Sequence, residues 1–390
     1  MSLPMDDAAR VAELRSQYPA LSHHIYLNTG TSGPLARDTA EAIAAETMRE
    51  AVAGRMTLER FGVLGRARSS IAAALEVSRD EVALTTSTGD GLNIVLLGLP
   101  WQAGDEVITT TTEHSSLLLP LGVLRQRYGV VVRFADLPAD DAGVIAALEA
   151  RINTRTRLLA LSHVSYATGA VAPLRALAKM AHGRGIAVLM DGAQAFCSIP
   201  LDLTASGVDF YAVTGQKWLC GPEGTGALYV RRAALDRLTP TVAGLFMAKD
   251  STPEGYFLPH HGARRLEGGT RYLPAVAGQI NALERWRDVI GPDWAYARIQ
   301  RLAARLMAGL GGIPRVEVIT PPHAHAGLVS IRADGLSPES LASQLDRDHA
   351  IWCRSIPWTP WLRFSTGWYN TEEEVDRTVA AVEDAVRRTG

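Results

Sequence analysis

Cysteine is scarce in this sequence. Its 390 residues include 3 cysteines, Cys197, Cys220 and Cys353, which lie far apart along the chain. A disulfide framework or a zinc knuckle needs more cysteines at closer and more regular spacing, so both are excluded. Unpaired thiols in small number are typical of a reducing compartment, and we therefore predict a cytoplasmic location.

An excess of charge of either sign is also missing. The sequence has 39 lysines and arginines against 41 aspartates and glutamates, for a formal net charge of -2, and no long run of like charge. Nucleic acid and anionic membranes are attracted by basic patches, so we predict neither as a partner.

Residues 1–10 are polar and acidic, unlike a signal peptide. No apolar run approaches the roughly 18 residues of a membrane span. Two pairs of adjacent histidines, at 23–24 and 260–261, lack the spacing of a helical metal site, so no metal is predicted.

What the sequence has is a regular alternation of apolar strands and helical stretches between residues 81 and 230, which predicts an α/β fold. The expected sheet is large and mostly parallel, with helices on both faces. Its strands are expected at residues 82–85, 106–110, 130–134, 158–161, 187–190, 210–213 and 226–230.

The second half of the chain indicates a smaller unit. Residues 239–271 show no clear period, and a helix begins near residue 273. Strands at 316–319, 327–331 and 361–365 and a last helix at 371–388 then predict an α+β unit. Because the chain is longer than one core usually supports, we predict three parts. These are an N-terminal helical segment at 1–25, a large domain at 26–275 and a small C-terminal domain at 276–390.

The most informative motif is a pair of charges, each close to the end of an apolar strand. Asp191 follows Ile186–Met190, and Lys217 comes shortly after Phe210–Val213. Buried parallel strands deliver such charges to the carboxyl edge of a sheet, where open α/β sheets bind ligands. Pyridoxal phosphate (PLP) needs a lysine amine for a Schiff base and an anion that keeps its ring nitrogen protonated. Either residue alone would more simply be a helix cap or a solvated surface group.

Two further strand ends add to this pair. Thr85–Asn93 places hydroxyls and glycines between a strand and a helix, where converging backbone amides bind phosphate. An ordinary helix cap is the alternative for this segment. His114 follows another strand and could stack on a cofactor ring or exchange protons with a substrate, or else be an ordinary loop histidine.

Taken in order, these motifs resemble the class V aminotransferase-fold enzymes, which include cysteine desulfurases, cyst(e)ine C-S lyases and isopenicillin N epimerase. The resemblance rests on Asp191-Gly192-Ala193-Gln194, on Thr214-Gly215-Gln216-Lys217 and on the glycine-rich Gly221–Gly226, and it runs from about Tyr26 to Glu374. It implies PLP fold type I, the aspartate aminotransferase-like fold. It also implies PLP as cofactor, an amino acid as substrate and a homodimer with shared active sites.

The resemblance assigns roles to single residues. Lys217 would form the Schiff base with PLP, Asp191 would pair with the ring nitrogen and His114 would stack on the ring. Gln194 would donate to the phenolic oxygen of the cofactor. Residues implied to hold the phosphate are Thr88, Gly89, Thr214, Gln216 and, from the second subunit, Thr270. Residues implied at the substrate are Arg363, which would receive the carboxylate, Arg354 and Thr29.

The sequence departs from the family at two places. Much of the family has asparagine near the ring where this chain has Tyr166, which would contact PLP by stacking or by its phenol. Desulfurases of this type carry a mobile cysteine between two arginine positions, whereas here Ser355–Trp361 contains none. Cys353 and Cys220 lie nearby in sequence, and each is more simply a small buried hydrophobe than a persulfide carrier.

These features favour one reaction and leave others open. Without a nucleophilic thiol, removal of the α-proton by Lys217 leads most simply to loss of the β-substituent. The loop Asn28–Pro34 also resembles that of cyst(e)ine C-S lyases. We therefore predict a β-eliminating C-S lyase acting on a cysteine-derived substrate. The alternatives are a cysteine desulfurase using Cys353 or Cys220, an isopenicillin N epimerase-like racemase or other biosynthetic enzyme, and a non-catalytic PLP-binding protein.

Overall fold

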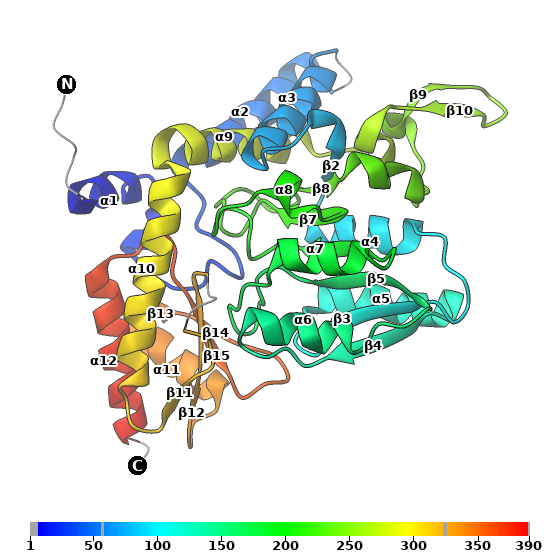
Figure 1. Cartoon of the computed structure of the whole chain (residues 1–390). Helices are drawn as coiled ribbons and strands as arrows, with labels where there is room; N and C mark the ends of the chain where they lie inside the picture. The colour runs from blue at the N-terminus through cyan, green and yellow to red at the C-terminus, as the bar shows by residue number, and fades with distance from the viewer. Residues whose placement is uncertain (1–6, 56–57, 323–325, 389–390) are drawn as a thin grey trace.

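A large sheet lies at the centre of the chain in this computed structural model, which describes residues 7–55, 58–322 and 326–388. Among these residues, seven strands form the sheet in the order β2-β8-β7-β6-β5-β3-β4 (Figure 1). Only β8 runs antiparallel to its neighbours, so the sheet is mostly parallel, as predicted. The bounds are β2 (Val82–Thr85), β3 (Glu106–Thr110), β4 (Val131–Ala135), β5 (Thr156–Ser162), β6 (Ala187–Asp191), β7 (Phe210–Thr214) and β8 (Gly226–Val230).

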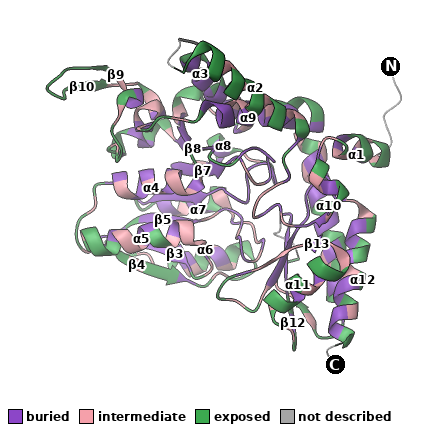
Figure 2. Ribbon diagram, turned by 180° about the vertical axis from the view of Figure 1, so that it is seen from behind, coloured by how far each residue is buried: buried purple, intermediate pink, exposed green. Residues whose placement is uncertain are grey.

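Helices cover both faces of this sheet. Along β5, Leu158 and Ala160 join a core that includes residues of α4 and α5, whereas Leu159 and Leu161 join a core that includes residues of α3 and α7. Figure 2 shows the buried strands between these helical layers. The helices of this part are α2 (Arg37–Ala53), α3 (Leu58–Ala74), α4 (Thr88–Gly98), α5 (Ser115–Tyr128), α6 (Asp141–Glu149), α7 (Leu174–His182), α8 (Leu203–Ser206) and α9 (Leu273–Glu284). No helix in the described ranges combines the length and apolar character that a bilayer crossing requires.

Strand register brings the motif residues to one edge of the sheet. Ser162 of β5 pairs with Asp191 of β6, and Asp191 pairs with Ala212 of β7. Gly226, the first residue of β8, pairs with both Thr85 and Thr214. The carboxyl ends of the parallel strands therefore meet where open α/β sheets bind ligands.

The C-terminal part of the chain forms the predicted smaller α+β unit. Its sheet has the order β11-β12-β15-β14, and a separate pair joins β1 and β13 in parallel. Because β1 pairs with β13, residues 25–26 lie against this unit. The bounds are β1 (Ile25–Tyr26), β11 (Val316–Val318), β12 (Leu328–Ala333), β13 (Ile351–Trp352), β14 (Arg354–Ser355), β15 (Leu362–Ser365), α10 (Pro292–Gly311), α11 (Pro338–His349) and α12 (Glu372–Arg388). The division at residues 25/26 and 275/276 stays a prediction, and residues 1–6 lie outside the described ranges.

Residues 239–271 have more structure than their sequence indicates. They contain the hairpin β9 (Ala248–Ser251) and β10 (Phe257–Pro259) and two 3-10 helices, η4 (Leu245–Met247) and η5 (Gly262–Leu266). The hairpin projects away from the rest of the molecule (Figure 1) and is largely exposed. An exposed two-stranded ribbon needs no apolar alternation, which is why no period marked it.

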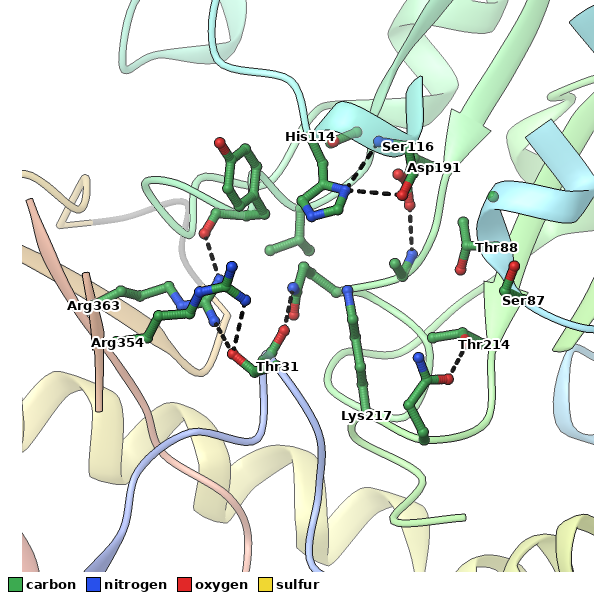
Figure 3. A pocket seen from close by; sticks show the side chains of 18 residues that line it. Thr31, Ser87, Thr88, His114, Ser116, Asp191, Thr214, Lys217, Arg354 and Arg363 are labelled. Atoms are coloured by element: carbon green, nitrogen blue, oxygen red, sulfur yellow. Dashed lines mark hydrogen bonds between the residues drawn. The ribbon is translucent and has the colours of Figure 1, made fainter. Parts of the chain in front are cut away.

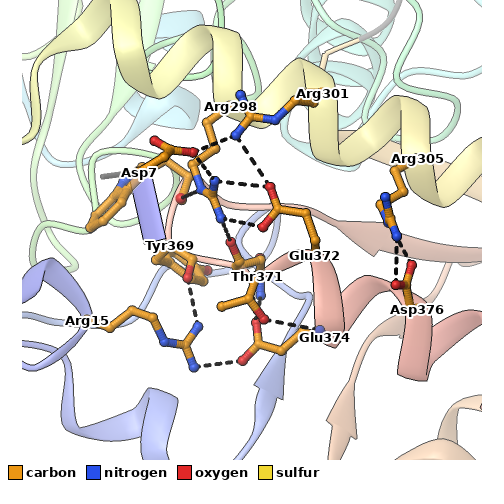
Figure 4. A network of polar contacts seen from close by, with 12 residues as sticks. Asp7, Arg15, Arg298, Arg301, Arg305, Tyr369, Thr371, Glu372, Glu374 and Asp376 are labelled. Atoms are coloured by element: carbon orange, nitrogen blue, oxygen red, sulfur yellow. Dashed lines mark hydrogen bonds and ion pairs between the residues drawn. The ribbon is translucent and has the colours of Figure 1, made fainter. Parts of the chain in front are cut away.

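Arg298 of α10 holds the N-terminal helix α1 (Asp7–Arg15) and the start of α12 together (Figure 4). Its side chain is 2% exposed. Its Nε donates to the Trp368 carbonyl at 2.8 Å and its Nη2 to the Asn370 carbonyl at 2.6 Å. Its Nη1 lies 2.8 Å from Asp7 Oδ2, and its Nη2 lies 3.1 Å from Glu372 Oε2. One buried guanidinium therefore satisfies two carbonyls and two carboxylates.

We expect Arg298→Ala to lower the free energy of unfolding by about 3 kcal/mol, because it leaves these acceptors without their buried donor. Urea unfolding followed by circular dichroism measures this loss. Arg305→Ala is the matched control, since Arg305 lies on the same helix and pairs with Asp376 at the surface. Its loss should be much smaller. Equal losses for the two variants would contradict the interpretation.

Candidate active site

A cavity of about 210 Å³ lies at the carboxyl edge of the large sheet and is closed by residues of the smaller unit (Figure 3). It brings together eleven of the thirteen residues that the sequence selects. They are Thr88, Gly89, His114, Tyr166, Asp191, Gln194, Thr214, Gln216, Lys217, Arg354 and Arg363. The two that do not line it are Thr29 and Thr270.

Lys217 points into the middle of this cavity (Figure 3). Burial lowers the pKa of its amine to about 8, and the negative charge of Asp191 partly opposes this change. Asp191 is buried at the end of β6, where Oδ1 accepts from the Ala193 amide at 2.9 Å. Burial raises the pKa of this carboxyl, against the influence of Lys217 and of that amide. The two charges interact more strongly at this buried sheet edge than they would in water, because the protein interior screens them less.

The start of α4 forms one end of the cavity. Ser87 caps the helix by accepting from the Asp90 amide at 3.1 Å, and Ser87, Thr88 and Gly89 line the cavity. Thr88 Oγ1 is buried and has no hydrogen-bond partner within the described ranges. Thr214 lies at the same end and donates its hydroxyl to Gln216 (Figure 3). An unpartnered hydroxyl at a helix N-terminus fits an anion such as the predicted phosphate.

His114 lies over the centre of the cavity and also caps α5. Its Nδ1 accepts from the Ser116 amide at 3.1 Å, which leaves Nε2 as the ring's other polar atom. Burial lowers the pKa of His114 to about 4, and the charges of Lys217, Arg354 and Arg363 act in the same direction. The imidazole is therefore neutral at pH 7. Tyr166 meets it edge to face, with the ring centroids 5.0 Å apart.

The loop after β1 closes the cavity from the N-terminal side. Gln194 Nε2 donates to the Gly30 carbonyl at 2.7 Å, and its Oε1 accepts from Trp218 Nε1 at 2.9 Å. The second amide hydrogen of Gln194 remains for a cofactor. Gly33 packs so tightly here that a Cβ on it would lie 2.2 Å from the Lys217 carbonyl oxygen. Only glycine fits at that position.

Two arginines form the end of the cavity opposite α4. Arg363 Nη1 donates to the Tyr166 carbonyl at 2.9 Å, and its Nη2 donates to Thr31 Oγ1 at 3.1 Å. Arg354 Nη1 donates to the same hydroxyl at 3.3 Å. Neither arginine has an ion-pair partner among the described residues, and Arg363 is 1% exposed. Burial and the charge of Arg354 lower the pKa of Arg363 to about 9. Two guanidiniums without a counter-ion in the described ranges have the charge and geometry to bind a carboxylate.

Two of the selected residues lie outside the cavity. Thr29 is 1% exposed and forms a hydrogen bond with the Tyr369 hydroxyl, so it faces the buried core to which Tyr369 belongs. From its loop, Gly30 and Thr31 line the cavity instead, because the chain turns at Gly30. Thr270 is exposed and contributes nothing to the cavity of its own chain. Its implied contact with a second subunit stays a prediction.

The structure adds site residues that the sequence did not single out. These are Gly30, Thr31, Ser87, Ser116, Ser162, Val164 and Ala193. All lie within or beside the segments that carry the motifs, so the segments were informative. Which side chain of a loop faces inward depends on its turns, and no spacing in the sequence reveals that.

None of the three cysteines, all of which the structure describes, lines the cavity. Cys197 and Cys220 are buried. Burial raises the pKa of Cys220 to about 12 and also raises that of Cys353. A thiol acts as a nucleophile only when ionised, so neither is poised to attack a substrate.

Comparison with known proteins agrees with this geometry. A family model described as Aminotransferase class-V matches residues 43–378. A probable cysteine desulfurase of Methanothermobacter thermautotrophicus is 30% identical over an alignment of 388 residues, covering 94% of this chain and 96% of that protein. The isopenicillin N epimerase of Streptomyces clavuligerus is 31% identical over 388 residues, covering 92% of this chain and 94% of that protein.

Solved structures extend the comparison to the fold. The cystine C-S lyase C-DES, in complex with its reaction product cysteine persulfide, has a TM-score of 0.88 and 30% identity, covering 94% of this chain and 99% of that one. A C-DES variant with glycine covalently linked to its PLP cofactor has a TM-score of 0.89 and 29% identity, covering 95% and 99% of the two chains. These similarities confirm the predicted fold, PLP fold type I.

The neighbouring charges predict how Lys217 responds to pH. In the cofactor-free protein its acylation by acetic anhydride should rise with pH, with a midpoint near 8 that matches the pKa of the amine. Asp191→Asn should move this midpoint to lower pH, because the carboxylate favours the protonated amine. Competitive labelling and mass spectrometry measure both midpoints, with the exposed Lys249 as internal reference. A midpoint that rises in Asp191→Asn would contradict the electrostatic coupling.

Proposed function

This chain belongs to the class V aminotransferase family and is a PLP-dependent enzyme, and we propose that it is a β-eliminating C-S lyase acting on a cysteine-derived amino acid. The predicted family and cofactor are thereby confirmed. One observation carries the proposed reaction. The cavity joins Lys217 to two unpaired guanidiniums and has no thiol in its wall. The cytoplasmic location belongs to the same proposal, and the three unpaired cysteines support it.

PLP, when bound, accepts the electrons left at the α-carbon of an amino acid, and the residues of the cavity suit each task around it. Lys217 would form the Schiff base and Asp191 would hold the ring nitrogen protonated. Thr88, Gly89, Thr214 and Gln216 would hold the phosphate at the start of α4, where the buried Thr88 hydroxyl lacks a partner. His114 would stack on the ring, and Gln194 would donate to its phenolic oxygen.

Arg363 would receive the α-carboxylate of the substrate through its planar fork, with Arg354 beside it. The α-carbon would then lie between the arginine pair and Lys217, whose amine points into the middle of the cavity (Figure 3). With a pKa of about 8, this amine is neutral often enough near pH 7 to accept the α-proton. The neutral His114 carries its hydrogen on Nε2, because Nδ1 accepts from the Ser116 amide, and it would donate a hydrogen bond to a leaving group, while the protonated Lys217 would supply the proton.

Elimination requires no further protein group. The Cβ–S bond breaks, the sulfur leaves with its electron pair and takes up a proton, and hydrolysis of the remaining fragment gives pyruvate and ammonia. A desulfurase would instead need a thiolate to take the sulfur. Cys353 lies outside the cavity wall and has a raised pKa, so it does not suit that role.

We expect the purified enzyme to convert cystine or a cysteine S-conjugate into pyruvate, ammonia and a persulfide or thiol. Cys353→Ala should keep this activity, whereas Lys217→Ala should lose at least about a thousandfold, as expected for removal of a catalytic base and covalent anchor. Lactate dehydrogenase coupling and thiol derivatisation follow the products. Sulfur transfer to the protein that depends on Cys353 would support a desulfurase instead. Exchange of the α-proton in deuterated water without release of product would support an epimerase.

We further infer that two copies of this chain assemble into a homodimer. Exposed apolar side chains gather on the segment that carries Thr270, and such patches mark interaction surfaces. They are Val242, Leu245, Tyr256, Phe257, Leu258 and Tyr272. Thr270 is exposed beside them and would reach the phosphate in the cavity of the second copy. No residue of 244–261 lines the cavity of its own chain, so this segment would also contribute to the second copy.

Sedimentation equilibrium should therefore give twice the mass of the chain. Leu245→Asp should weaken the dimer, because it places a charge within the apolar patch. Phe134→Asp is the control, since Phe134 is also exposed but lies on β4. This strand forms the edge of the large sheet opposite to the edge formed by β2. A monomeric unmodified protein, or equal effects of the two substitutions, would overturn the inferred interface.

A further inference from the structure

Leu84 lies in the edge strand β2. Side chains of one loop form hydrogen bonds with both its backbone amide and its backbone carbonyl. Glu267 Oε1 accepts from the Leu84 amide at 3.0 Å, and Arg271 Nη2 donates to the Leu84 carbonyl. Within the large sheet β2 has β8 as its neighbour on one side, so these groups would otherwise face an open edge. Glu267 and Arg271 flank Gly268–Thr270, so both ends of this loop are hydrogen-bonded to Leu84.

Glu267 and Arg271 each accept hydrogen bonds from an arginine of α3. Glu267 is 2% exposed and accepts from the Nε of Arg68 at 3.0 Å and from its Nη2 at 2.9 Å. The carbonyl of Arg271 accepts from Nη2 of the buried Arg60 at 2.6 Å. Since α3 supplies both Arg60 and Arg68, the loop is positioned by a helix on one side and by β2 on the other.

Arg271 also reaches the turn that leads from β2 into α4. Its Nη1 lies 3.6 Å from Asp90 Oδ2. The same oxygen accepts from the Thr86 amide at 2.9 Å and from Thr86 Oγ1 at 3.1 Å. Asp90 therefore closes the turn that contains Thr88 and Gly89, and Arg271 contacts this turn at both ends, through Leu84 before it and through Asp90 after it.

Arg271 does not line the cavity, and its side chain is 10% exposed. Within the described ranges its side chain contacts Leu84 and Asp90, at the two ends of the turn, and neither residue lines the cavity. We propose that Arg271 is a positioning residue for the phosphate site. It fixes Thr88 and Gly89 for the phosphate of PLP, and it couples this turn to the loop that carries Thr270. The inference rests on the proposed assignment of Thr88 and Gly89 to the phosphate.

A residue that acts only through the phosphate site has a distinctive signature. PLP carries the phosphate, whereas pyridoxal has the same ring and aldehyde without it. Loss of Arg271 should therefore weaken binding of PLP and leave binding of pyridoxal unchanged. A general loss of packing would weaken both ligands alike, because it would also disturb Lys217 and Asp191.

The test measures dissociation constants of PLP and pyridoxal for the cofactor-free, full-length protein by tryptophan fluorescence quenching. Arg271→Ala should raise the constant for PLP about tenfold, as expected for loss of a charge-assisted contact, without changing that for pyridoxal. Asp90→Asn is a second variant, for use if Arg271→Ala folds poorly. It keeps an acceptor for Thr86 but removes the charge that faces Arg271, and we expect it to weaken binding of PLP and not of pyridoxal.

Arg265→Ala is the matched control. Arg265 lies on the same segment, donates to the Leu235 carbonyl and pairs with Asp236 at 3.0 Å, and its Nε is buried without a partner like that of Arg271. It has no contact with the turn, so neither constant should change. Equal weakening of both ligands in Arg271→Ala and Asp90→Asn, or no weakening of PLP, would overturn the proposal.

Thr88→Ala separates failure of this inference from failure of the site assignment. If Thr88→Ala leaves the preference for PLP over pyridoxal intact, Thr88 does not hold the phosphate, and the assignment and this inference both fail. If Thr88→Ala reduces the preference while Arg271→Ala does not, the site stands and the positioning role of Arg271 is wrong.

Discussion

The structure depends on the interaction between the buried Asp191 and the partly buried Lys217, which lie at the same edge of a sheet. Isolated charges in a protein interior are strongly disfavoured, and burial by itself favours the neutral form of both groups. Each residue favours the charged form of the other. Lys217 lowers the pKa of Asp191, and Asp191 raises the pKa of Lys217. The parallel sheet makes this possible, because adjacent strands end at the same level and hold the two residues in fixed positions.

The rest of the site extends outward from this pair in two directions. Towards α4, hydroxyls and helix amides create a place for an anion, and the buried Thr88 hydroxyl has no other partner. Towards the smaller unit, Arg354 and Arg363 share the Thr31 hydroxyl and have no counter-ion among the residues that the structure describes. A bound molecule with a phosphate at one end and a carboxylate at the other would thus be oriented before any chemistry occurs. The neutral His114 lies between these ends.

Much of this arrangement could be predicted from the sequence, because it depends on local patterns. Apolar strands and their spacing predicted the sheet, and each of its strands begins and ends within two residues of the expected positions. Charges at strand ends predicted Asp191, Lys217 and His114 as neighbours. The failures are local as well. The hairpin β9–β10 is exposed and carries no apolar alternation, and Thr31 rather than Thr29 reaches the cavity because a turn at Gly30 reverses which side chain faces inward.

By itself, then, the sequence predicted the α/β sheet and pointed to PLP through charges at strand ends, and the resemblance of its motifs to a known family supplied the fold family. The tertiary structure alone decided what surrounds the centre of the site. Cys353 is kept out of the cavity by the packing of the smaller unit, and Arg271 contacts the phosphate turn from a segment far away in the chain. Such contacts depend on how distant elements pack in three dimensions, and spacing along the chain does not encode that distance.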